Sequence, residues 1–335
     1  MRKHNSNCIR VKIFIVKKNS CILTFGGNDE QIYHINMNKK ILIAFVGICF
    51  SWSFSWFAIK FQMQSTVSPF ISVTYRFLFA GLLLLLGLKL FNISLKISRK
   101  ECKFIAISGV CNASINFILA YNSAKYIPSG VTAAIFSLTI IMGEVINAII
   151  YRTKINKNTI ISGLIGTSGL MLFLLPIINI SGDKIAIITG IWLSFSGTLL
   201  ATLGMISMRA CAIKHNTHAM VFLTYTFICG AIISFCTGMF LGAEIKFDTS
   251  LSYVLSLAYI VVFASCIAFA SLFYLNKHIG VARAGFSSLI YTVSAMFIST
   301  YFEDYNWSFV NIAGFGMIIF AIFNELHSKN KRISK

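Results

Sequence analysis

Long apolar segments recur along the chain, and they constrain its fold more than any other feature. Ten of them are about 20 residues long, which is the length that an α-helix needs to cross the hydrocarbon core of a bilayer. The ten predicted spans are 41–60, 69–89, 103–121, 128–150, 159–178, 185–208, 219–241, 251–275, 280–301 and 307–325. We therefore predict an all-α membrane protein with ten transmembrane helices.

The composition agrees with a lipid environment. Of the 335 residues, 57% are hydrophobic and only 12% are charged, whereas a soluble domain is about 25% charged. The net charge is +19, but the basic residues lie in short clusters between apolar segments, which argues against nucleic-acid binding. The nine Cys form no Cys-x-x-Cys pair, so we expect no metal site. No phosphate-binding Gly-x-x-x-x-Gly-Lys motif occurs, and no cofactor is expected.

The distribution of Lys and Arg predicts the orientation. If the N-terminus is cytoplasmic, the inside segments from residue 37 onward hold 18 Lys and Arg and the outside loops hold 4. Cytoplasmic loops carry such an excess of basic residues. We therefore expect a multi-pass protein of the cytoplasmic (inner) membrane with both termini in the cytoplasm.

The two halves of the chain resemble each other weakly. An offset of 152 residues places Phe117 on Phe269 and Lys125 on Lys277. Chance similarity between apolar segments is the alternative, but the shared loop length argues against it. Because each half has five spans, the halves must insert in opposite directions, and inverted repeats are typical of secondary transporters.

Four segments carry a resemblance to a known family. They are 50–60, 69–80, 124–134 and 279–285, whose order and spacing agree with ten inverted helices. The chain resembles the drug/metabolite transporter superfamily, specifically its EamA-like group, which implies transport of amino acids, related metabolites or drugs. The predicted organisation is a disordered tail or mis-called start, two EamA-like five-helix repeats and a basic cytoplasmic tail, over 1–36, 37–181, 182–326 and 327–335.

Two ionisable residues lie well inside predicted spans, where charge is costly and usually functional. Arg76 could hold a substrate carboxylate or phosphate. Alternatively, its long stem could reach the outer interface, or it could brace neighbouring carbonyl groups. Glu144 shares a helix face with Ser137 and Asn147, and it could bind a cation or carry a coupling proton. A structural ion pair between Arg76 and Glu144 is the alternative.

Four further residues are predicted to line the substrate cavity. Trp52, near Ser55, could stack on a ring or a cation, or could simply pack or face lipid. Asn116 belongs to a polar stripe with a four-residue spacing, which either bonds across helices or lines a cavity. Tyr291 belongs to a similar stripe on the ninth span.

These patterns favour a secondary carrier for a small polar metabolite, such as an amino acid or organic ion. It would work by alternating access as an exporter or exchanger, with proton coupling left open. Its partners would be a small-molecule substrate and the lipid bilayer, and a homodimer is left open. An enzyme is not expected. The alternatives are a lipid-modifying membrane enzyme, a non-transporting scaffold and, less favoured, a channel.

Overall fold

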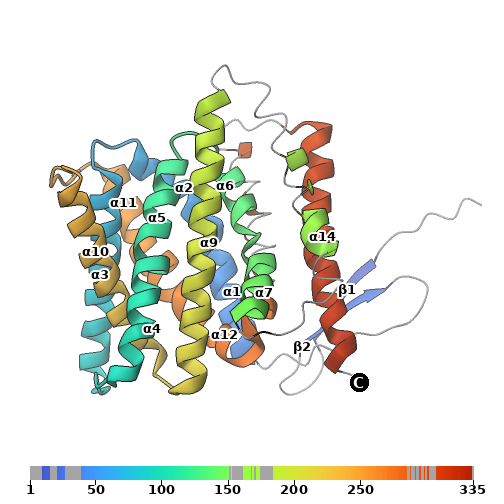
Figure 1. Ribbon diagram of the computed structural model, residues 1–335, viewed down its shortest axis with the longest axis horizontal. Helices are drawn as coiled ribbons and strands as arrows, with labels where there is room; N and C mark the ends of the chain where they lie inside the picture. The colour runs from blue at the N-terminus through green and yellow to red at the C-terminus, as the bar shows by residue number, and fades with distance from the viewer. Residues whose placement is uncertain are drawn as a thin grey trace, which may run out of the picture.

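The computed structural model contains a bundle of helices with a small two-stranded sheet beside it (Figure 1). The structure describes residues 10–15, 21–26, 39–150, 152, 161–166, 168–169, 171–173, 184–284, 287, 291, 294–295, 298, 300–301 and 307–333.

The helices of the first half are α1 (Lys39–Ser53), α2 (Ser55–Met63), α3 (Pro69–Leu90), α4 (Arg99–Val110), the π-helical turn η1 (Cys111–Ile115), α5 (Asn116–Ser123), α6 (Ser129–Phe136) and α7 (Thr139–Ile150). Those of the second half are α9 (Lys184–Lys214), α10 (Ala219–Phe240), α11 (Leu251–Tyr259), the π-helical turn η2 (Ile260–Ile267), α12 (Ala268–Ala284) and α14 (Phe309–Ile333).

Seven described helices are long and apolar enough to cross a membrane. They cover Lys39–Met63, Pro69–Leu90, Arg99–Ser123, Val131–Ile150, Lys184–Lys214, Ala219–Phe240 and Leu251–His278. Two shorter apolar helices, Ile161–Phe173 and Phe309–Ala321, coincide with the fifth and tenth predicted spans. The ninth, 280–301, lies partly outside the described residues. The multi-pass helical architecture is therefore confirmed, while the number ten stays a prediction.

The surface of the bundle is suited to lipid. Large apolar side chains are exposed on several helices, among them Ile43, Leu90, Trp192 and Phe240, whose exposed fractions are 70%, 70%, 63% and 89%. A water-soluble monomer rarely exposes so many. Aliphatic, small and aromatic side chains fill the interior, where Arg76 is also buried.

Local chemistry sets where several helices begin. Pro69 occupies the first turn of α3, where its missing N–H costs nothing. At the start of α4, the Ser98 amide donates to Glu101 Oε2 over 2.6 Å, and the Thr217 hydroxyl donates to the other carboxylate oxygen of Glu101. Because Thr217 precedes α10, this carboxylate also ties the two halves together.

The helices pack in reciprocal pairs. The first helix of the first half, α1 with α2, packs against α11 and α12, and α9 packs in the corresponding way against α4 and α5. The second helices of the halves, α3 and α10, pack against each other. In Figure 1 the chain ascends from α1 to α2 but descends along α9. The first helices therefore run in opposite directions, as in an inverted repeat.

The two π-helical turns support the same alignment. Moving η1 forward by 152 residues places it at 263–267, which lies inside η2. Phe117 and Phe269, which this offset also equates, contact each other with ring centroids 6.3 Å apart. A π-helical turn often marks a functional site, and both turns lie in the middle of the bundle.

The small-residue faces of the fifth and tenth spans form a close helix crossing. A Cβ added to Gly169 would lie 2.8 Å from the carbonyl oxygen of Gly314. Asn311 Nδ2 donates to the carbonyl oxygen of Phe173 over 2.6 Å, and Asn324 Nδ2 donates to Ser162 Oγ over 3.1 Å. These bonds hold the two apolar helices together without charge.

The segment preceding the first helix contains an antiparallel hairpin. Strands β1 (Arg10–Ile15) and β2 (Cys21–Gly26) pair from Arg10 with Gly26 to Ile15 with Cys21. Figure 1 places this hairpin beside the bundle. The assignment of 1–36 as a disordered tail or a mis-called start stays a prediction, because only 10–15 and 21–26 of this segment are described.

Candidate substrate cavity

A narrow cavity lies between the two halves of the bundle. Its free volume is about 20 Å³, which holds roughly one water molecule. It is lined by Trp52, Ser55, Trp56, Ile59, Arg76, Asn112, Asn116, Phe117, Phe136, Met205, Phe269, Leu272 and Tyr291. Five of the six predicted site residues are therefore brought together here, and Glu144 is not among them.

Arg76 is the charged residue of this cavity. Its side chain is only 1% exposed, so it does not reach the interface. Its Nε donates to Ser265 Oγ over 2.9 Å and its Nη2 to the carbonyl oxygen of Ala264 over 3.5 Å, so both bonds go to η2. The guanidinium carbon lies 3.9 Å from the centroid of the Phe117 ring. The cation is thus held between a π-helical turn and an aromatic face.

No carboxylate of the described residues forms an ion pair with Arg76. Glu144 lies half-buried on α7, which packs against α9 and α12. The predicted alternative, a structural pair between Arg76 and Glu144, does not form.

The polar face predicted to carry Glu144 is interrupted, because α6 ends before Ser137 and α7 begins at Thr139. The Ser137 and Thr139 hydroxyls donate to the carbonyl oxygens of Ala134 and Phe136 over 2.6 Å.

Several buried polar atoms of the lining have no hydrogen-bond partner among the described residues. They are Arg76 Nη1, Trp56 Nε1, Asn112 Nδ2, Asn116 Nδ2 and Asn116 Oδ1. Each residue is less than 9% exposed, and a buried polar atom without a partner costs about 1–3 kcal/mol. Such a group of atoms in one cavity is typical of a binding site rather than of a packed core.

Aromatic rings form the opposite walls. Trp52 Nε1 donates to the carbonyl oxygen of Ala264 over 3.0 Å, and its ring meets Phe269 and Tyr291 edge to face, with centroids 5.8 and 5.4 Å apart. Trp56 lies 5.1 Å from Phe136. Both Trp side chains therefore face the interior rather than lipid.

Sequence patterns marked some of the remaining lining residues as candidates and not others. Ser55 contributes little polarity, because its hydroxyl donates to the carbonyl oxygen of Trp52 over 3.0 Å. Asn112 shares the four-residue spacing of Asn116, so the stripe indicated it. Met205 and Leu272 carry no distinguishing signal, since ordinary apolar side chains fill both the core and the cavity wall.

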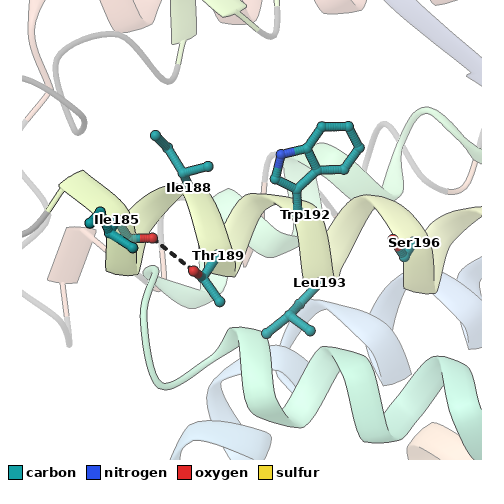
Figure 2. Close-up of a pocket in the computed structure, with 6 residues that line it drawn as sticks. All are labelled: Ile185, Ile188, Thr189, Trp192, Leu193 and Ser196. Carbon is teal, nitrogen blue, oxygen red and sulfur yellow. Dashed lines mark hydrogen bonds between the residues drawn. The ribbon is translucent and has the colours of Figure 1, made fainter.

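A second hollow lies on the outside of the bundle. Figure 2 shows its lining residues, which all come from one helix, α9: Ile185, Ile188, Thr189, Trp192, Leu193 and Ser196. The Thr189 hydroxyl donates to the Ile185 carbonyl oxygen over 2.8 Å, so its polarity is satisfied locally. This groove has the character of a lipid-facing surface.

The fold and the cavity define a two-repeat helical membrane protein with a buried polar centre. The model of the EamA-like transporter family matches residues 39–175 and again 188–324. The chain belongs to the EamA-like transporter family, and the resemblance expected from the sequence is confirmed together with its internal repeat.

One solved structure, titled "Crystal structure of protein", is 14% identical to this chain. The match has a TM-score of 0.62 and covers 86% of this chain and 96% of that one. At this identity it shows a shared fold alone. No curated protein sequence matches the chain.

Proposed function

We propose that this protein is a secondary transporter of a small polar metabolite, such as an amino acid or organic ion, and that it works by alternating access as an exporter or exchanger. The observation that supports it best is the buried cavity between two oppositely directed halves, which joins one cation to unpaired polar atoms. Secondary transporters bind their substrates at this position between repeats.

Alternating access would use the reciprocal packing of the helices. The cavity has room for about one water molecule, so a metabolite cannot enter without movement of its walls. Rocking of α1–α2 with α11–α12 against α9 with α4–α5 would open the cavity on one side and then on the other. We propose ten spans in a cytoplasmic membrane with both termini inside.

Glu144 has a different proposed role from Arg76. It lies on α7 outside the cavity lining, so it would act on coupling rather than by touching the substrate. An ionisable group inside a membrane span is costly and often belongs to a proton or ion pathway. Glu144→Gln should then remove the effect of a pH gradient while leaving exchange intact.

The test is transport by purified protein in liposomes, with amino acids and related metabolites offered with and without a pH gradient. Asn116→Ala, which removes cavity donors, should lower saturable flux. Trp192→Ala, on the lipid-facing groove of α9, is the matched control and should leave flux unchanged.

A complete absence of flux across the panel would contradict the carrier and favour a lipid-modifying enzyme or a scaffold. Flux that Asn116→Ala leaves at the wild-type level would place the site elsewhere. Linear flux without saturation would favour a channel.

A further inference from the structure

We infer that the cavity recognises the anionic group of its ligand, and that the ligand is an organic carboxylate with an apolar or aromatic body; this rests on the proposed function for the claim that such a ligand is also carried. The protonated amine of an amino acid is not the recognised group.

Arg76 makes the charge of the described cavity lining positive. Arg76 is buried to 99% and forms no ion pair with any described carboxylate. Among the described lining residues there is no Asp or Glu. Burying a cation without an anion is strongly unfavourable, and the Ser265 and Tyr121 hydroxyls, the Ala264 carbonyl and the Phe117 ring around Arg76 compensate only in part. A ligand carboxylate would supply the missing anion.

The unpaired atoms point to the same ligand. Arg76 Nη1 and Trp56 Nε1 can only donate, and Asn112 and Asn116 each contribute an unpaired Nδ2. Among the described lining atoms that are both fully buried and unpaired, Asn116 Oδ1 is the only acceptor. Arg76 and Trp56 remain donors whichever way the two amides are turned. These fixed donors suit the two oxygens of a carboxylate better than an ammonium group, which needs acceptors.

These donors come from three membrane spans, because η1 and α5 belong to the single span Arg99–Ser123. Trp56 lies on α2, Arg76 on α3, and Asn112 and Asn116 lie on η1 and at the start of α5. Their convergence on one cavity is unlike the exposed anion site at a single helix end. The π-helical turn η1 explains part of this convergence, because one extra residue in the turn changes the direction of the side chains that follow.

The walls indicate the rest of the ligand. Trp52, Phe117, Phe136, Phe269 and Tyr291 surround the cavity. Aromatic faces and edges pack well against apolar and aromatic groups. Because the free volume is only about 20 Å³, the ligand body must displace these rings, which fits an element that closes around its substrate.

The experiment is equilibrium binding by calorimetry to the purified full-length protein in detergent. Three matched pairs of compounds differ only in the charged group: butyrate and propylamine, 3-phenylpropionate and phenethylamine, and indole-3-propionate and tryptamine. We expect at least one carboxylate to bind at least about 10-fold more tightly than its amine. If no carboxylate binds more tightly than its amine, the inference is wrong.

Asn116→Asp provides the second arm, because it changes a donor into an anion with almost no change in shape. It should weaken carboxylate binding at least about 10-fold. Asn122→Asp is the matched control on the same helix. Asn122 does not line the cavity, and its Nδ2 donates to the Ile118 carbonyl oxygen over 2.8 Å. Equal weakening by both variants, with both folded by thermal unfolding, would also overturn the inference.

Binding and transport can fail separately. Carboxylate-selective binding without flux in liposomes would contradict the transporter and leave the ligand assignment standing. Saturable flux of amines, with no flux of carboxylates, would support the transporter and overturn the ligand assignment.

Discussion

Replacing Gly230 by Ala should destabilise the protein, although Ala is the better helix former. Gly230 lies inside α10, where it faces Ala113 of η1. A Cβ added there would lie 2.7 Å from Ala113 Cβ and 2.8 Å from its carbonyl carbon, closer than the 3.0 Å below which Cβ contacts essentially never fall. The obstacle is partly backbone, so η1 has to move away from α10.

Two opposing terms set the magnitude. Crowding of a well-packed contact costs about 1–3 kcal/mol, and the backbone in the way places Gly230→Ala toward the upper end. The gain in helix propensity is about 1 kcal/mol. We expect a net loss of about 1–2 kcal/mol in the free energy of unfolding.

The matched control is Gly87→Ala in α3, the corresponding helix of the first half. An added Cβ at Gly87 meets nothing within 4 Å, so only the propensity gain of up to about 1 kcal/mol remains. Thermal unfolding of both variants in detergent should place Gly230→Ala below the wild type and Gly87→Ala at or above it. Carboxylate binding should also weaken in Gly230→Ala, because η1 carries Asn112. A Gly230→Ala protein as stable as Gly87→Ala would refute the packing argument.

Three further changes test single contacts of the core and the cavity. A double-mutant cycle on Ser114 and Ser234, whose hydroxyls are 2.8 Å apart between η1 and α10, should give a coupling of about 0.6–1 kcal/mol in unfolding free energy; additive effects would mean that the bond contributes nothing. Ser265→Ala removes the acceptor of Arg76 Nε and should raise KM several-fold with little change in unfolding temperature; an unchanged KM would mean that Ser265 does not position Arg76. Trp52→Phe keeps an aromatic ring but loses the indole N–H that bonds to the Ala264 carbonyl, and it should lower the unfolding free energy by about 1 kcal/mol. An unchanged unfolding free energy would show that this bond is replaceable.

Hydropathy predicted most of the helices because lipid demands long apolar segments. The predicted first span, 41–60, lies inside Lys39–Met63, and the predicted second, 69–89, nearly coincides with Pro69–Leu90. The breaks within the spans were not predictable in this way. The interruption between α6 and α7 and the π-helical turns depend on side-chain hydrogen bonds and on packing between halves, to which average hydropathy is insensitive.

The polar residues of the candidate site were predictable because polar side chains are rare within membrane spans. Its apolar residues were not, because such side chains are common throughout the spans. Arg76, Asn116 and Tyr291 stand out because a membrane span seldom carries them. Glu144 stands out for the same reason, yet the structure places it away from the cavity lining. Rarity shows that a residue is costly to bury, but which residues meet depends on how the helices pack. That Arg76 would bond to Ser265, 189 residues away, could not be derived from either segment alone.

The internal symmetry of the fold is not shared by its chemistry. Helices α3 and α10 are both 22 residues long, and aligning them places Thr226 opposite Arg76. The offset that superposes the π-helical turns places Ala264 and Ala268 opposite Asn112 and Asn116. The second half thus lacks the charge and both amides, and supplies a carbonyl oxygen and a hydroxyl that hold Arg76 in place. If the two halves rock against each other as proposed, a ligand bound chiefly by one half would move with it, and the bonds from Arg76 to η2 would have to be remade. Substrate recognition and the inward–outward change would on this account meet at a single side chain, Arg76, for which the second half has no equivalent.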